Sequence, residues 1–306
     1  MNKFEICILG CGSAMTTIHH WGTSQVVNVD GRLFLIDCSE GTIHQLLVNH
    51  IKLSHIEQIF ISHLHIDHCQ GLLGLISAMS LMNRKQPLTI YYHPELEQIL
   101  APQLQFFIPK LSFELRLVHI CDDSYILYDD EDVIVSTVSL QHRIKCNAFI
   151  FKTKDKKVVH VNKSAIDHYN IPCNSIPDIL AGADYMTSEG HTIHNSALVN
   201  IEYVASQKYV YCSDTLPMLD ANKLFYKADL LYHDSTFTSA DGERAFQTHH
   251  STALQAAKVA TANNVEQLML GHFSARYPDE NVMLDEAKTI FENTILAKEN
   301  LIVKLK

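Results

Sequence analysis

The stretch FISHLHIDHCQG, residues 60–71, places three histidines and one aspartate within six positions. These side chains are His63, His65, Asp67 and His68. Neutral imidazole and carboxylate are the ligands that suit zinc or manganese. Because four such groups follow a short apolar strand and lie in one tight loop, they are directed at one small volume. The stretch therefore predicts a metal site.

Histidine is unusually frequent, at 19 of 306 residues, which is roughly three times the ordinary share. Some histidines are therefore expected to have a chemical role, although most should occupy ordinary surface or core positions. We assign such ordinary roles to His44, His55, His93, His119, His160, His168, His191 and His194.

The composition is that of a globular protein. Apolar residues make up 47% of the chain and charged residues 19%, so a sizeable core can be buried. A length of 306 residues fits one large domain or two small ones. Short apolar strands alternate with turns and amphipathic stretches, without a low-complexity tract or a clear linker. This organisation favours one layered α/β domain over residues 1–306.

The pattern of apolar residues predicts the elements that must position the candidate ligands. The expected strands are 4–10, 25–29, 33–37, 58–61, 88–91, 133–139, 148–152, 209–212, 230–233, 267–270 and 301–305. The expected helices are 42–48, 72–82, 94–104, 216–226, 252–261 and 282–291, with Ser251 as the candidate cap of the fifth. Most candidate functional residues follow strand ends, where a rigid sheet can hold them and leave them accessible.

Signals for export and for membrane insertion are missing from the pattern. Lys3 and Glu5 interrupt what would be the apolar part of a signal peptide, and the longest weakly polar run, 69–82, is too short for a membrane span. We therefore expect a cytoplasmic protein with no membrane partner. The eight cysteines form no CxxC pair, which favours reduced and mostly buried thiols.

The charge distribution bears on nucleic-acid binding. The formal net charge of −10 argues weakly against a protein coated in nucleic acid. Residues 143–163, however, contain seven basic residues and one acidic residue, whereas residues 164–207 contain no Lys or Arg. Local charge and bound metal matter more here than the total.

The HxHxDH pattern at His63 resembles the signature of the metallo-β-lactamase superfamily. Three later stretches, LQHRI around His142, YCSDT around Asp214 and LGHFSARY around His272, narrow the resemblance to the ribonuclease Z family of tRNA 3′-processing endoribonucleases. ILGCGSA, DCSEG, HDSTF and HHSTALQAAKVA follow in family order, so the resemblance covers nearly the whole chain.

The resemblance implies a four-layer αββα sandwich with two metal ions, Zn²⁺ with Mn²⁺ as the alternative, at one edge. It implies that one ion is held by His63, His65 and His142, the other by Asp67, His68 and His272, and that Asp214 bridges them. The residue types agree with this assignment. Seven such ligands allow two metal sites with open coordination positions, as catalysis requires.

Two adjacent metal ions favour phosphodiester hydrolysis, because they can polarise the phosphate and stabilise the leaving oxygen. Asp67 is then the candidate general base and His250, in HHSTA, the candidate acid for the departing ribose oxygen. The alternative for His250 is a histidine that only caps a helix. Asp234 is the candidate for the carboxylate that orients His250. The resemblance implies precursor tRNA as the substrate and a homodimer in which one subunit grips what the other cuts.

The sequence also departs from the family pattern. Thr16 and His19 stand where the early loop usually has proline and arginine, Ser39 replaces a glycine and Ile66 replaces the glycine of HGDH. HEATF becomes HDSTF. None of these changes removes a predicted metal ligand.

A reduced or altered arm is expected within about residues 153–207. Many family members grip the tRNA elbow with a glycine- and proline-rich basic tip, but here the tip reads YNIPCNSIPDILAGADYMTSEGHTI, without a positive charge. Such a tip cannot contact phosphate through cations. The preceding KTKDKK, 152–157, is either a substitute anchor or a solvated hairpin tip.

Two alternatives to tRNA processing follow from these departures. One is a paralogous metal-dependent phosphodiesterase for a small or cyclic phosphodiester, favoured by the uncharged arm and the missing arginine. The other is a catalytically weak metal-binding RNA-interaction protein whose changed loops, 16–21 and Ser39, have silenced the site.

Overall fold

The computed structural model describes residues 3–121, 125–218 and 225–305. These residues form two compact units. The main unit comprises 1–153 and 207–306 with those gaps, and the arm unit is Lys154–Ser206. No helix among the described residues is long and apolar enough to cross a membrane.

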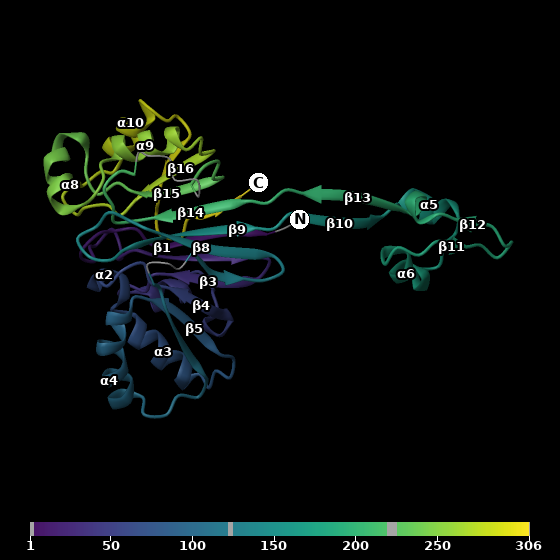
Figure 1. Cartoon of the computed structure of the whole chain (residues 1–306), viewed down its shortest axis with the longest axis horizontal. Coiled ribbons are helices and arrows are strands. Elements are labelled where there is room, and N and C mark those ends of the chain that lie inside the picture. The colour runs from purple at the N-terminus through teal and green to yellow at the C-terminus, as the bar shows by residue number, and fades with distance from the viewer. Residues whose placement is uncertain (1–2, 122–124, 219–224, 306) are drawn as a thin grey trace. The chain divides into compact units, whose positions relative to one another are not determined.

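Two mixed sheets make up the centre of the main unit (Figure 1). The described residues give each sheet seven strands, with both parallel and antiparallel neighbours. The first sheet has the order β18 (Ile302–Lys304), β1 (Phe4–Gly10), β2 (Ser24–Val29), β3 (Arg32–Ile36), β4 (Ile56–Phe60), β5 (Leu88–Tyr92), β6 (Leu115–His119). The second has the order β17 (Thr294–Leu296), β16 (Gln267–Gly271), β15 (Leu230–Asp234), β14 (Lys208–Cys212), β9 (Asn147–Thr153), β8 (Val133–Ser139), β7 (Ile126–Asp129).

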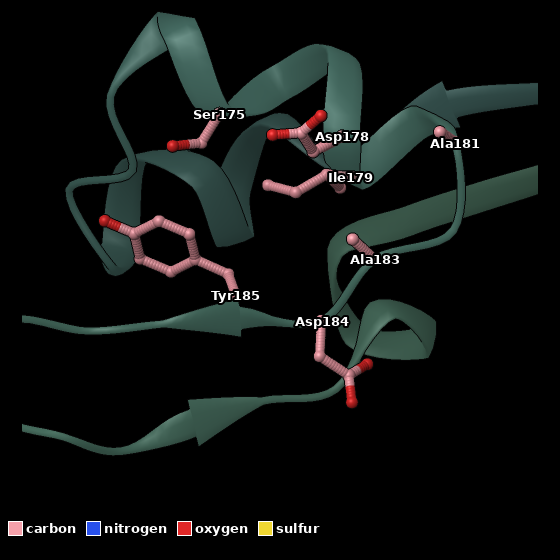
Figure 2. A pocket seen from close by; sticks show the side chains of 7 residues that line it. All are labelled: Ser175, Asp178, Ile179, Ala181, Ala183, Asp184 and Tyr185. Carbon is pink, nitrogen blue, oxygen red and sulfur yellow. The ribbon is translucent and has the colours of Figure 1, made fainter.

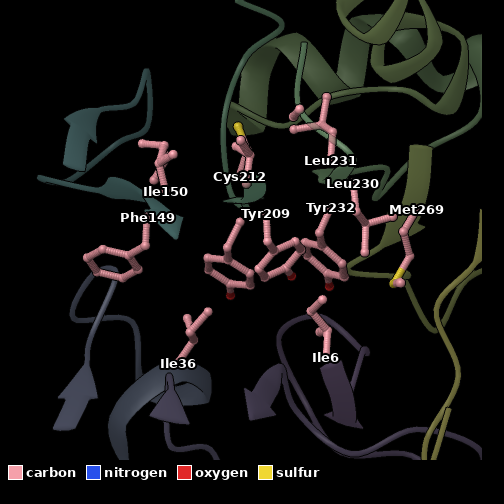
Figure 3. Close-up of a cluster of buried hydrophobic side chains, with 14 of the residues drawn as sticks. Ile6, Ile36, Phe149, Ile150, Tyr209, Cys212, Leu230, Leu231, Tyr232 and Met269 are labelled. Carbon is pink, nitrogen blue, oxygen red and sulfur yellow. The ribbon is translucent and has the colours of Figure 1, made fainter. Parts of the chain in front are cut away.

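The main core lies between the two sheets. Figure 3 shows Tyr209 and Tyr232 of the second sheet pointing towards Ile6 and Ile36 of the first, whereas Leu231 points to the opposite side. All five side chains are buried. Because both faces of these strands are covered, they consist of nearly continuous apolar residues rather than an alternating pattern.

Helices cover the outer faces of both sheets and complete the four layers (Figure 1). Against the first sheet pack α1 (Thr42–Val48), α3 (Leu72–Leu81) and α4 (Glu97–Phe107), which share a core with its strands. Against the second sheet pack α9 (Ala253–Ala262) and α10 (Asn281–Lys288). The αββα sandwich expected from the sequence is confirmed.

Several element predictions need correction. The helix expected at 216–226 is not present in its described part, because 216–218 have no regular secondary structure and 225–226 form a turn; residues 219–224 lie outside the described residues. Thr252, not Ser251, caps α9, since its side chain accepts from the backbone N–H of Gln255 in a complete capping box. Ser251 instead donates to the carbonyl of Thr215. The last helix ends at Lys288 and not at residue 291.

The arm unit has its own strands, helices and small core. Strands β10 (Lys156–Val161) and β13 (Val199–Val204) pair antiparallel. The other elements are α5 (Lys163–His168), α6 (Ile176–Leu180), β11 (Tyr185–Met186), β12 (Thr192–Ile193) and α7 (Asn195–Leu198). Its core comprises Ile171, Ile179, Ile193, Leu198 and Val199.

The lysine-rich stretch at 152–157 is not a hairpin tip. It runs from the end of β9 into β10, and β10 pairs with β13 rather than with β9. The residues beyond it form a separate pocket of about 290 Å³, where Figure 2 shows Asp178, Ile179, Asp184 and Tyr185. The arm unit therefore presents carboxylates where a phosphate-binding tip would present cations.

Candidate metal centre and active site

The seven predicted metal ligands come from five places in the main unit. His63 and His65 lie in the loop after β4, and Asp67 and His68 in the short helix α2 (Ile66–Cys69) rather than in a continuous loop. The remaining ligands follow strands of the second sheet: His142 after β8, Asp214 after β14 and His272 after β16. The ends of strands from both sheets thus meet at one site.

One group contains His63, His65, His142 and Asp214, whose ligand atoms all lie within 4.8 Å of one another. Nδ1 of His65 is 2.9 Å from Nε2 of His63 and 3.2 Å from Nε2 of His142. Oδ1 of Asp214 is 3.7 Å from Nε2 of His63. Three imidazole nitrogens and one carboxylate oxygen therefore surround one small volume.

A second group contains Asp67, His68 and His272, again within 4.8 Å. Asp214 lies between the groups. Its Oδ2 is 3.2 Å from Nε2 of His68, and its Oδ1 is 3.2 Å from Nε2 of His272. The structure thus brings all seven predicted residues together, with one carboxylate facing both groups.

Four imidazoles are held in one tautomer by hydrogen bonds on their outer nitrogens. Nδ1 of His68 donates to Oδ2 of Asp37 at 2.8 Å, and Nδ1 of His142 to the His249 carbonyl at 3.0 Å. Nδ1 of His63 lies 3.0 Å from the Ser62 hydroxyl, which itself donates to Asp37.

Nδ1 of His272 lies 2.8 Å from the Thr236 hydroxyl, which itself donates to Asp234. Each hydroxyl must therefore accept from the imidazole. All four imidazoles consequently direct an Nε2 lone pair towards the site.

The donor atoms fit metal ions. Nε2 of His68 and Nε2 of His272 are buried and make no hydrogen bond, although each lies 3.2 Å from Asp214. Buried polar atoms are rarely left without a partner. This arrangement is expected of metal ligands, because a bound ion would contact both imidazole nitrogens and the buried carboxylate.

Several pKa shifts favour metal binding, whereas that of His68 goes the other way: burial alone would lower its pKa, but the carboxylates of Asp214 and Asp37 raise it well above the usual value. Burial lowers the pKa of His63 well below its usual value, and burial lowers that of His142 to about 4. Burial alone would raise the pKa of Asp214, but the imidazoles of His272 and His68 hold it well below the usual range. Neutral imidazoles and an ionised carboxylate are the forms that coordinate metal.

Asp37 was not assigned a role from the sequence, yet it supports the site from behind. Its carboxylate is fully buried and accepts from His68, from the Ser62 hydroxyl at 2.8 Å, from the Ser62 N–H at 2.7 Å and from the Tyr211 hydroxyl at 2.6 Å. The available signal was an aspartate directly after a buried strand.

His250, the predicted acid, lies beside the two groups. Its Nδ1 donates to Oδ2 of Asp234 at 2.8 Å, so Asp234 is the orienting carboxylate. Burial alone would lower the pKa of His250, but the charge and hydrogen bond of Asp234 raise it above the usual value. Thr236 contacts His250, Asp234 and His272, and thereby links the acid to a predicted ligand.

Asp67, the predicted base, is positioned by the early loop. Its Oδ2 accepts the Ala14 N–H at 2.8 Å. Burial alone would raise the pKa of Asp67, but the imidazoles of His68 and His272 lower it below the usual value. Asp67 is therefore ionised at neutral pH, with its carboxylate held at the mouth of the site.

A cavity of about 360 Å³ opens over both groups. Its walls include the predicted ligands His65, Asp67, Asp214 and His272 together with His250. The rest of the wall is formed by Ser13, Ala14, Ile66, Arg143, Thr236, Phe237, Arg244, Thr248, Ser274 and Arg276. Four of the seven proposed ligands, the proposed base Asp67 among them, thus line one pocket together with the proposed acid His250.

Three departures from the family pattern are accommodated locally. Ser39 does not have a positive φ, so its position does not require glycine, and its hydroxyl donates to the Gly22 carbonyl at 2.7 Å. Ile66 is 67% exposed at the edge of the cavity. Thr16 lies on the surface and bonds to Glu40. None of these residues displaces a predicted ligand.

Cys11, His20 and Glu299 form a further group that sequence analysis missed, because 279 residues separate His20 from Glu299. Unlike the site atoms, both nitrogens of His20 are satisfied, by Glu299 and by Glu280. Of the eight histidines given ordinary roles, seven are exposed, and His93 is buried.

Comparison with known proteins gives matches along the whole chain. The chain is 45% identical to ribonuclease Z of Bacteroides fragilis over 307 aligned positions, covering 100% of both chains. It is 38% identical to ribonuclease Z of Porphyromonas gingivalis, again covering 100% of both. A model of the family described as anti-Pycsar protein Apyc1 matches residues 4–143.

Solved structures show the same fold. The short form of human tRNase Z aligns with a TM-score of 0.70 and 24% identity, over 99% of both chains. The metallo-β-lactamase fold protein YhfI from Bacillus subtilis aligns with a TM-score of 0.69 and 16% identity, over 99% of this chain and 100% of that one.

Proposed function

This chain belongs to the ribonuclease Z family, and on that premise we propose that it is a metal-dependent endoribonuclease. It removes the 3′ trailer from precursor tRNA after the discriminator region and leaves a 3′-hydroxyl. The observation that carries the proposal is the convergence of seven ligand-type side chains, one of them the ionised Asp67, beside the carboxylate-bound His250.

We propose two zinc ions per chain, with manganese as the alternative. His63, His65 and His142 would hold one ion and Asp67, His68 and His272 the other, with Asp214 between them. Bound there, the ions would supply Lewis-acid polarisation of the phosphate and an activated water. The unpartnered Nε2 atoms of His68 and His272 support this assignment.

The chain's own residues supply the proton transfers. Asp67, fixed by the Ala14 N–H, accepts the proton of the attacking water. His250 donates its proton to the departing O3′ of the ribose, while the phosphate stays on the trailer. Burial alone would lower the pKa of His250, but Asp234 raises it, which favours the protonated imidazole that this step requires.

We propose that the chain acts as a homodimer. An apolar groove of about 390 Å³ borders the active-site cavity at Ile66 and is lined by Leu73, Ile99 and Leu100. Ile66 and Ile99 are 67% and 58% exposed, which favours cover by a second copy. Ile99→Glu should shift the sedimentation coefficient from dimer to monomer, whereas an unchanged coefficient would place the interface elsewhere.

We propose that residues 1–306 form a single metallo-β-lactamase-like domain of which the arm unit is a part. We also propose that the arm unit contacts the substrate only through the lysines at its start. Lys156, Lys157 and Lys163 lie at the start of this unit, and residues 164–206 contain no Lys or Arg. Phosphate contacts require such cations. A cytoplasmic location remains a prediction from the sequence.

The test is single-turnover cleavage of a 3′-extended precursor tRNA by zinc-loaded protein, with the product end mapped. Cutting at the 3′ end of the acceptor stem is expected, and both a chelator and Asp67→Ala should abolish it. Asp285→Ala, an exposed aspartate of α10, is the matched control and should cut normally. Activity that survives in Asp67→Ala would refute the assigned mechanism.

A small-substrate phosphodiesterase is the second candidate, favoured by the cation-free tip of the arm unit. It predicts turnover of bis(p-nitrophenyl) phosphate or a cyclic nucleotide without measurable binding of tRNA.

A further inference from the structure

Three arginines line the active-site cavity: Arg143 beside His142, Arg244 on α8 (Gly242–Thr248) and Arg276 after His272. All three are exposed. Arg276 lies 3.8 Å from Asp241 and over the ring of Phe237. Arg143 and Arg244, by contrast, form no ion pair with a carboxylate anywhere in residues 3–121, 125–218 and 225–305.

Unpaired cations at this place call for an explanation, because the chain carries a net charge of −10 and has 34 acidic residues available as partners. Arg143 follows a predicted metal ligand directly, and its positive charge acts on both His65 and His250. Cations close to a site for metal ions repel them unless an anion intervenes.

The scissile phosphodiester carries a single negative charge. Two divalent ions bound by Asp67, Asp214 and the imidazoles would already neutralise this charge. The positive charges of the two arginines are therefore available for a further phosphate. Guanidinium groups suit that role, because their planar array of donors matches phosphate oxygens. They approach from separate elements, the β8–β9 connection and α8.

We propose that Arg143 and Arg244 form an anion subsite for the phosphate next to the scissile one. The inference rests on the proposed function and narrows it to polynucleotide substrates with at least two adjacent phosphates.

The experiment compares UpU in which a methylene replaces the bridging O3′, so that water attack cannot cleave it, with the same dinucleotide carrying a 5′-phosphate or a 3′-phosphate; affinities are measured by calorimetry on the zinc-loaded protein. One added phosphate should tighten binding about tenfold, as one charge-assisted contact does. Arg143→Gln combined with Arg244→Gln should abolish this gain and leave binding of plain UpU within about twofold.

Arg116→Gln is the matched control, because Arg116 is an exposed arginine paired with Glu114 on β6 and outside the cavity. It should retain the full gain. Equal affinity of the wild type for all three dinucleotides would overturn the proposal, as would a gain that persists in the double variant. Loss of plain UpU binding would place the arginines on the scissile phosphate and also overturn it.

Cleavage of precursor tRNA is measured separately on the wild type. If that cleavage is absent, the proposed function fails, whereas the dinucleotide series still decides whether the subsite exists. On precursor tRNA the double variant should raise KM with little change in kcat, and should reduce the dependence of binding on salt concentration.

Discussion

His20 is held between two carboxylates, and its replacement should change the stability of the main unit in a pH-dependent way. Nδ1 of His20 lies 3.0 Å from Oε2 of Glu299, and Nε2 lies 2.9 Å from Oε1 of Glu280. The hydrogen bond to Glu299, above all, raises the pKa of His20 to about 9 from 6.5. The His20 side chain is only 15% exposed, so solvent screens this pair weakly.

The sign and size follow from linkage between protonation and folding. A histidine with a raised pKa in the folded state stabilises the fold fully below its unfolded pKa, and the contribution disappears as pH rises through the folded pKa. With 6.5 and about 9 as the two values, the contribution is about 3 kcal/mol at pH 6, about 2 kcal/mol at pH 7.5 and below about 1 kcal/mol at pH 9. Besides the two glutamates, Cys11 faces the ring; burial raises its thiol pKa well above its usual value, so it stays protonated in this window.

The assay is urea unfolding of wild type and His20→Gln at pH 6, 7.5 and 9, followed by tryptophan fluorescence. Trp21 is the single tryptophan and donates its backbone N–H to Glu299, so its signal reports on this region. His119→Gln, which breaks an exposed pair with Glu97, is the control and should leave the free energy of unfolding nearly unchanged at every pH. A His20→Gln penalty that stays constant from pH 6 to 9 would refute the charged-histidine explanation.

Three further changes test other parts of the structure. Tyr211→Phe removes one of the donors to Asp37 and should weaken zinc binding about tenfold in competition with a chromophoric chelator; unchanged affinity would show that this hydroxyl does not support the site. Asp234→Asn should lower the pKa of His250, so that the alkaline limb of the pH–rate profile for RNA cleavage moves to lower pH. Hydrolysis of bis(p-nitrophenyl) phosphate, whose leaving group needs no proton, should keep its alkaline limb, and a common shift would exclude His250 as the acid. Thr252→Ala should cost about 1 kcal/mol of unfolding free energy by loss of the α9 cap, and an unchanged urea midpoint would contradict the capping geometry.

The sequence was informative where burial imposes a pattern. Strands β1 and β8 and helix α1 have the expected bounds, because buried strands consist of apolar runs and α1 of an amphipathic turn pattern. Strand β6 was missed, since its residues are half-exposed and carry no continuous apolar signal. An arm was expected within about residues 153–207, but its internal strands and helices were not predicted, because these short elements share a small core of five residues.

The ligands of the candidate site could be predicted from the sequence, but the residues that position them could not. His63, His65, Asp67 and His68 are local in sequence, and residue type with spacing was sufficient to single them out. The hydrogen bond of Thr236 to His272 and the ion pair of His20 with Glu299 join residues 36 and 279 positions apart. Such contacts depend on how the two sheets meet, which no local pattern encodes.

Three strand ends at the site adopt a backbone conformation that side chains normally avoid. Asp37, Asp214 and His272 have φ values of 55°, 56° and 62°. Each costs about 1–2 kcal/mol relative to right-handed backbone, and glycine would relieve the strain. Glycine would also delete the carboxylate that holds His68, the carboxylate between both ligand groups, or an imidazole of the second group. Nine other non-glycine residues among those described also have a positive φ, so the conformation by itself does not mark the site. At these three positions the side chains of the candidate site decide the residue type against backbone preference.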